Sequence, residues 1–179
     1  MSKPEVKMYE KQPKTLPKYV SKEVINELLD KAKKSDYRDY ILLLTLWRTG
    51  MRVSDIVNLR KKDIMDDTLF IKKGKGLKDR VIPLNNELGA LLGLYVDNNT
   101  PNAKVFNIKE RQVRNIVYKY NKDLHPHTIR HSFAVLYLKS GGNLRSLQII
   151  LGHSNLNTTA IYLDLVAEDI KDDYKKIQW

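Results

Sequence analysis

The sequence predicts a mainly α-helical domain with one small antiparallel β-sheet, an α+β fold. Two observations carry this prediction. Apolar residues recur at steps of three and four over most of the chain, which is the spacing of one helix face. In one short region they alternate instead, as in strands, on both sides of a loop that contains two glycines. The length of 179 residues suits one compact domain better than two of ordinary size.

The chain begins with a segment that lacks a helical period. Residues 1–20 are rich in lysine and contain three prolines, so we expect a linker or arm there. Ser21 suits the N-cap of a first helix, because four apolar residues follow it at helical spacing. A second, strongly apolar helix is expected over residues 36–49, with Gly50 as its C-cap. A short helix is expected over residues 53–59.

The strand signal lies in the segments TLFIKK and DRVIPL, at residues 68–73 and 79–84. Both segments are rich in β-branched residues and partly alternating. Between them, GKGLK at residues 74–78 supplies two glycines for a turn. We therefore predict a β-hairpin whose loop is longer than the common two-residue turn.

Helical spacing returns after the hairpin. Helices are expected over residues 86–97, 109–121, 126–139, 144–151 and 157–165. Pro126 suits the first turn of its helix, and Gly152 ends the helix that precedes it. Apolar residues at steps of four, four and three from Val166 predict a tail helix. We expect residues 21–165 to form the domain, and the tail at 166–179 to pack on its own core or on a neighbouring subunit.

Composition limits the class of protein. The absence of cysteine excludes disulfides and thiolate metal sites. No segment approaches the ~20 apolar residues of a membrane-spanning helix. The N-terminal residues also lack the apolar stretch of a signal peptide. A soluble, cytoplasmic protein without membrane partners is the expectation.

The charge of the chain is strongly positive and unevenly distributed. Lysine and arginine number 32 against 21 acidic residues, for a net charge of +11. Residues 41–80 and residues 101–131 each carry +5, whereas residues 81–100 carry −2. Two basic segments that meet in the fold would form a surface for a polyanion, of which nucleic acid is the common one. A basic but merely soluble surface is the alternative.

The segment HPHTIRHSF, residues 125–133, holds the first candidate site residues. His127 and Arg130 are three residues apart and share a helix face. They lie near a helix start, where backbone N–H groups favour an anion, so a phosphate could meet both side chains. His131 is expected to point elsewhere. An incidental histidine beside a solvated arginine is the alternative.

Two more segments and the hairpin add candidates. In TGMRVSDIVNLR, Arg52 follows a helix-ending glycine, and Asp55 is expected to orient it. In LGHSNLNTTAIY, His153 and Tyr162 flank a run of amides and hydroxyls. A lone tyrosine on an apolar helix face is usually a packing residue. The hairpin adds lysines among which physical reasoning alone does not select: Lys72, Lys73, Lys75 and Lys78.

Four segments, in this order and at these distances, resemble the tyrosine recombinase family, which includes phage integrases and Xer-type enzymes: TGMRVSDIVNLR, GKGLKDRVIPL, HTIRHSFA and LGHSNLNTTAIY. Six residues match the family's catalytic positions: Arg52, Lys75, His127, Arg130, His153 and Tyr162. Three positions depart from the usual pattern. Asp55 stands where glutamate is usual, His125 where a hydroxyl residue is common, and Asp164 where a histidine often follows.

The resemblance implies the family's catalytic-domain fold and site-specific DNA recombination. Tyr162 would attack a DNA phosphodiester, leaving a 3′-phosphotyrosine and a free 5′-hydroxyl. Religation to a new strand would then need no metal, ATP or other cofactor. Arg52 and Arg130 would clamp the phosphate, while His127 would accept the phenol proton and Lys75 would protonate the leaving oxygen.

The resemblance also implies a further phosphate contact and the partners. His153 would donate a hydrogen bond to a phosphate oxygen. The partner would be double-stranded DNA, with hairpin contacts from Lys72, Lys73, Lys78 and Arg80. A full-length protein would form a tetramer on two duplexes, while an isolated domain could be monomeric. An N-terminal DNA-clamping domain would be either removed or naturally absent.

Two other functions stay open at this point. One is DNA relaxation like that of a type IB topoisomerase, which uses similar chemistry without pairing sites. The other is a DNA-binding module that keeps the fold without activity. The implied setting is the nucleoid of a prokaryotic, archaeal or viral system.

Overall fold

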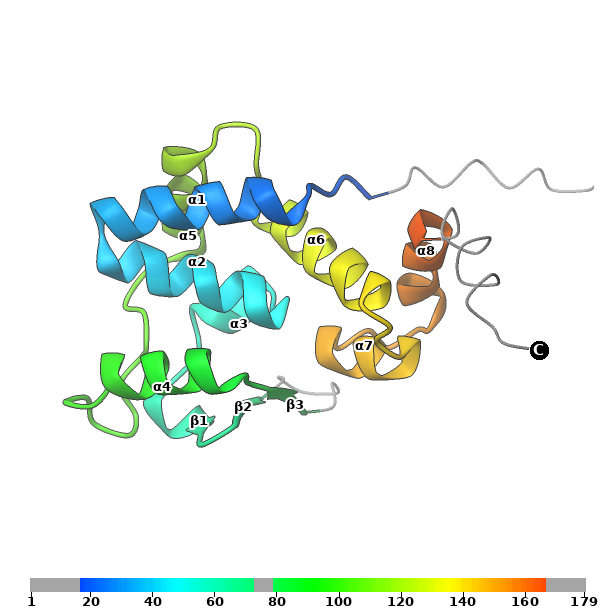
Figure 1. Ribbon diagram of the computed structural model, residues 1–179. Coiled ribbons are helices and arrows are strands. Elements are labelled where there is room, and N and C mark those ends of the chain that lie inside the picture. Colours follow the sequence, from blue (N-terminus) through cyan, green and yellow to red (C-terminus); the bar gives the residue numbers. More distant parts are fainter. Residues whose placement is uncertain (1–16, 73–78, 167–179) are drawn as a thin grey trace, which may run out of the picture.

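The computed structural model describes residues 17–72 and 79–166, apart from the side chain of Asp164. These residues form a helical body with one small sheet at its side (Figure 1), which confirms the predicted fold class. The α-helices within the described ranges are α1 (Lys22–Ser35), α2 (Tyr37–Thr49), α3 (Val53–Ile56), α4 (Asn86–Tyr95), α5 (Glu110–Tyr120), α6 (Pro126–Lys139), α7 (Leu144–Leu151) and α8 (Asn157–Val166), and a short 3-10 helix, η1, covers Lys61–Asp63.

The ends of α2 follow local signals in the sequence. The side chain of Asp36 accepts a hydrogen bond from the backbone N–H of Asp39 at 3.0 Å, which caps the first turn. Gly50 ends the helix at φ +59°, a left-handed conformation that favours glycine. A Cβ atom at Gly50 would also lie 2.3 Å from the ring of Phe133 on α6. The predicted C-cap is confirmed, and α2 and α6 can approach closely because of it.

The sheet contains three antiparallel strands in the order β1 (Ile64–Met65), β2 (Thr68–Ile71) and β3 (Arg80–Pro83). Leu69 pairs with Ile82, and both are buried, while the alternate residue Val81 is exposed. The predicted pairing of two strands is confirmed, and its loop at 74–78 lies outside the described residues.

The apolar side chains form two clusters. The larger one lies among α1 to α5 and the sheet, and reaches the first half of α6. The smaller one contains Ala134, Val135, Leu147, Leu151 and Tyr162, from α6, α7 and α8. In Figure 1, α6 crosses from the larger body to α7 and α8 at the far end. Helix α8 therefore packs mainly on α6 and α7.

Several predicted boundaries need correction at the helix ends. Helix α3 stops at Ile56 instead of residue 59, and α4 stops at Tyr95 instead of residue 97. The predicted tail helix falls outside the described residues from 167 onward. Within the described ranges, no helix has both the length and the apolar character that a bilayer crossing requires.

Candidate active site

Arg130 is a buried cation that connects the ends of two helices. Its Nη1 donates to the carbonyl oxygen of Gly50 at 2.6 Å, and its Nη2 donates to that of Leu151 at 2.8 Å. These carbonyls belong to the C-terminal ends of α2 and α7, where the helix dipole favours positive charge. Burial, followed by repulsion from Arg52, lowers the pKa of Arg130 to about 9. The guanidinium still carries its charge at neutral pH.

Arg52 lies beside Arg130. Its Nη2 donates to the carbonyl oxygen of Gly152 at 3.3 Å, next to the Leu151 carbonyl that Arg130 uses. Burial lowers the pKa of Arg52, and the charge of Asp55 opposes that effect. Two guanidiniums that bind consecutive carbonyls lie close enough to act on one anion.

Asp55 supports this arrangement in a way that the sequence did not predict. Its Oδ2 accepts from the backbone N–H of Arg52 at 3.0 Å and from Nη2 of Arg80 at 2.6 Å. Arg80 also donates from Nε to the carbonyl oxygen of Ile150 at 2.9 Å, and its side chain is only 3% exposed. In this structure these two donors of Arg80 point into the protein, and its predicted contact with DNA stays a prediction.

His153 follows Gly152, which ends α7 at φ +65°. Its Nε2 lies 3.0 Å from Nη2 of Arg130, and its Nδ1 lies 2.8 Å from the Thr159 hydroxyl. A guanidinium can only donate, so Nε2 accepts and the proton lies on Nδ1. Thr159 is fully buried and was not predicted as a site residue. Its hydroxyl holds the orientation of the His153 ring from the first half of α8.

His127 lies in the first turn of α6 and is exposed. With Arg52 and Arg114 it lines a hollow of about 370 Å³. Partial burial of the ring in this hollow, and then the charge of Arg130, lower the pKa of His127, so the ring is neutral at neutral pH. A neutral imidazole can accept a proton, as the resemblance requires.

Tyr162 is buried on α8, with 1% of its surface exposed. Its hydroxyl oxygen lies 2.7 Å from Nδ1 of His131 on α6. Burial raises the pKa of Tyr162, while the charges of Arg130 and Arg52 oppose the rise. The phenol thus lies within electrostatic reach of both guanidiniums.

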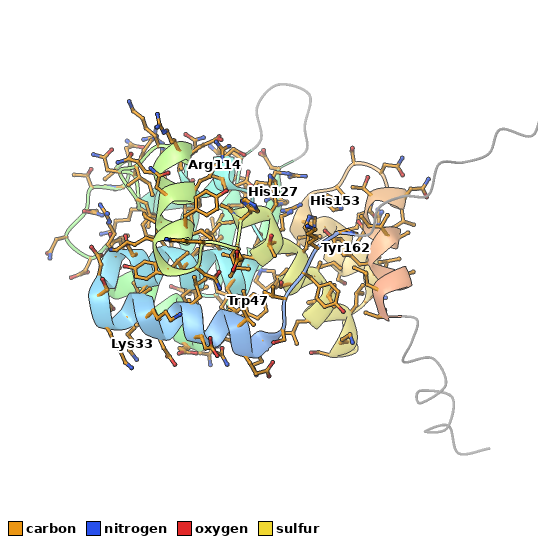
Figure 2. All side chains as sticks on the ribbon, turned by 90° about the horizontal axis from the view of Figure 1, so that it is seen from above. Lys33, Trp47, Arg114, His127, His153 and Tyr162 are labelled. Atoms are coloured by element: carbon orange, nitrogen blue, oxygen red, sulfur yellow. The ribbon has the colours of Figure 1, made fainter. Side chains whose placement is uncertain are left out.

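The expectation that His131 points away from the site is wrong. Its ring stacks on that of His127 at 6.4 Å and reaches Tyr162. The signal was present in the sequence, because residues four apart on a helix share a face. In Figure 2, His153 and Tyr162 are neighbours, and His127 lies between them and Arg114 of α5.

The hairpin lysines are only partly described. Lys72 is exposed and lines a hollow of about 600 Å³ with Arg52 and His153. Lys75, Lys73 and Lys78 lie outside the described residues. Five of the six predicted catalytic residues therefore fall in the described ranges, and the structure gathers them around the junction of α3, α6, α7 and α8.

Comparison with known proteins adds a finding that does not depend on the geometry. The model of the phage integrase family matches residues 18–168. A tyrosine recombinase of Pseudothermotoga lettingae is 38% identical over 176 residues, covering 90% of this chain and 61% of its own length. The chain therefore spans about three-fifths of that relative.

Solved structures agree with the sequence relatives. The crystal structure of XerA recombinase superposes with a TM-score of 0.76 at 30% identity, covering 93% of this chain and 68% of that one. XerH site-specific recombinase, bound to palindromic difH substrate, superposes with a TM-score of 0.70 at 26% identity, covering 90% and 54%. This chain belongs to the phage integrase family of tyrosine recombinases.

Proposed function

We propose that this chain is the catalytic domain of a site-specific recombinase that cleaves and rejoins double-stranded DNA. The observation that carries the proposal is the pair of guanidiniums, because Arg52 and Arg130 bind the consecutive carbonyls of Gly152 and Leu151. Attack on a phosphodiester increases the negative charge on its non-bridging oxygens. Two planar, charged donors held in place stabilise that charge without reorganising.

The proposed reaction uses Tyr162 as nucleophile. The phenol oxygen attacks phosphorus, the bond to the 5′-oxygen breaks, and a 3′-phosphotyrosine forms. The phenol proton passes to a base, for which His127 is the candidate, and the 5′-oxygen takes a proton from Lys75. The reverse attack by a 5′-hydroxyl from another strand restores the phosphodiester and frees Tyr162, so the ester conserves the bond energy.

The basic surface and the relatives support DNA as the partner. Arg60, Lys62 and Lys72 line the hollow beside Arg52. The structure of XerH is of a recombinase bound to a DNA substrate, and XerH shares this fold. We extend that partner to this chain, and we propose a tetramer on two duplexes in a full-length context. Phosphate contacts of this kind predict strongly salt-dependent binding.

A covalent trapping experiment tests the proposal. The full chain is incubated with a pool of nicked duplexes whose central sequence is randomised. Because of the nick, cleavage releases a short strand, and its loss prevents religation. We expect an adduct that survives denaturation and maps to Tyr162 by peptide mass spectrometry. Tyr162→Phe should form none.

Two further variants sharpen the test. Arg130→Lys should slow adduct formation by roughly 10²–10³, the usual effect of losing one oxyanion donor. Arg48→Lys is the matched control and should react at the wild-type rate, because Arg48 pairs with Glu87 away from the site. An equal adduct in Tyr162→Phe would remove Tyr162 as nucleophile. DNA binding with no adduct in the wild type would favour the non-enzymatic module.

A further inference from the structure

The hydroxyl of Tyr162 is held inside the protein by a side chain that the proposed reaction does not use. The oxygen lies 2.7 Å from Nδ1 of His131, and the two ring centres are 5.8 Å apart. Only 1% of the Tyr162 surface is exposed. A DNA phosphate approaching from outside therefore cannot reach this oxygen until the phenol moves.

The electrostatics of the pair favour a neutral hydrogen bond over proton transfer. Burial, with added repulsion from His127 and Arg130, lowers the pKa of His131 to about 4. Burial raises the pKa of Tyr162 above its ordinary value near 10. Transfer of the phenol proton to this imidazole is thus unfavourable by a factor of roughly 10⁶ or more. The two neutral groups share one hydrogen bond, and the phenol keeps its proton and stays in its unreactive form.

The packing of α8 allows the phenol to leave. Tyr162 belongs to the smaller apolar cluster, which α8 forms with α6 and α7. A shift of α8 therefore leaves the larger cluster intact. Besides packing, the contact between α8 and the rest of the domain includes the His131–Tyr162 bond and the His153–Thr159 bond.

We propose that His131 is a positioning residue, which holds Tyr162 withdrawn in the resting protein and releases it when α8 shifts toward DNA. This inference rests on the proposed role of Tyr162 as nucleophile. A catalytic base at this position would have to follow the tyrosine outward, whereas His131 is fixed on α6 between residues packed into the core. His131 therefore acts on the resting state.

The test measures the accessibility of the phenol without DNA. The full chain is nitrated with tetranitromethane, and modification at each tyrosine is quantified by peptide mass spectrometry. His131→Leu removes the hydrogen-bonding group, while His131→Asn retains one, because its amide lies close to the place of Nδ1. Tyr118, whose hydroxyl bonds Nδ1 of His125, is the internal reference. His125→Leu is the matched control variant.

We expect His131→Leu to raise nitration of Tyr162 by about tenfold, the effect of losing one net hydrogen bond. His131→Asn should stay near the wild-type rate, and Tyr118 should be unaffected by both. His125→Leu should affect Tyr118 and leave Tyr162 protected. Unchanged protection of Tyr162 in a folded His131→Leu variant would overturn the proposal. A cooperative unfolding transition in urea shows that each variant is folded. If His131→Leu unfolds without such a transition, His131→Ala takes its place.

Adduct formation with the nicked duplexes separates positioning from chemistry. His131→Leu should react at saturating DNA at least as fast as the wild type. A fall of about 10²-fold or more, with Tyr162 still protected, would make His131 part of the chemical step and overturn the proposal. If the wild type forms no adduct, the proposed function fails, but nitration still decides whether His131 holds Tyr162.

Discussion

Arg80 and Asp55 form an ion pair of 2.6 Å, with side chains that are 3% and 12% exposed. Asp55 also accepts from the backbone N–H of Arg52, so the pair connects β3 to the start of α3. Breaking such a pair from one side leaves a buried charge without its partner. The position of Arg52 thus depends on the Asp55 carboxylate, which accepts a hydrogen bond from its backbone N–H.

Asp55→Ala should therefore lower the free energy of unfolding by about 3 kcal/mol, because Arg80 keeps its buried charge. Urea denaturation gives the value. Glu110→Ala is the control, since Glu110 forms an exposed pair with Arg114 on α5, and it should lose less than about 1 kcal/mol. Equal losses in the two variants would mean that the Asp55–Arg80 pair contributes nothing specific.

Gly50→Ala should destabilise the protein by about 3 kcal/mol. The added Cβ meets the Phe133 ring at 2.3 Å, and φ +59° is unfavourable for alanine. Gly141→Ala separates the two effects, because Gly141 has φ +83° with open space around it. We expect about 1 kcal/mol there in the same urea experiment. A similar loss of unfolding free energy in both variants would show that the Phe133 ring moves aside at little cost.

Thr159→Val should slow adduct formation by about tenfold, although valine has nearly the same volume as threonine and preserves the packing. The hydroxyl of Thr159 holds the His153 ring so that Nε2 faces Arg130, and valine removes that contact. Thr159→Ser restores a hydroxyl and should recover most of the rate. Rates from single-turnover trapping decide the outcome, and no recovery with serine would assign the loss to packing.

Acid should weaken the fold through His131. Its pKa is about 4 in the folded protein and 6.5 in the unfolded chain, so the unfolded chain binds more protons between these values. The stabilisation is complete above pH 6.5 and is lost as the pH falls toward 4. Because the ring is partly exposed, we expect about 1–2 kcal/mol. Urea unfolding at pH 7.5 and 4.5 gives the free energy of unfolding of the wild type and of His131→Asn. Between these pH values the wild type should lose more stability than His131→Asn does, by this amount. Equal losses in the two proteins would contradict the prediction.

Local signals in the sequence were sufficient for the helices of the second half. Pro126 and Gly152 mark a helix start and a helix end, and α6 and α7 have the predicted bounds. Strand β1 was missed, because two residues carry no period and pair only through β2. The ends of α3 and α4, which no glycine or proline marks, were displaced by three and two residues.

The site residues were predicted from motifs, but their contacts were not. The carboxylate of Asp55 meets Arg80, which lies 25 residues away on a strand. That His131 shares a helix face with His127 could be predicted from their spacing of four residues. Its partner on α8, Tyr162, depends instead on how three helices pack. Which donors point inward is therefore a property of the tertiary structure, and Arg80 illustrates it.

Tyr162 is one of the largest fully buried side chains, and its ring fills the smaller cluster. In the proposed reaction the ring would leave this cluster to reach DNA, and it would open a void among Ala134, Leu147 and Leu151 that costs free energy. Once the phenol is free again, refilling that void would favour its return. The packing of Tyr162 would thus reset the proposed site between turnovers without an outside trigger.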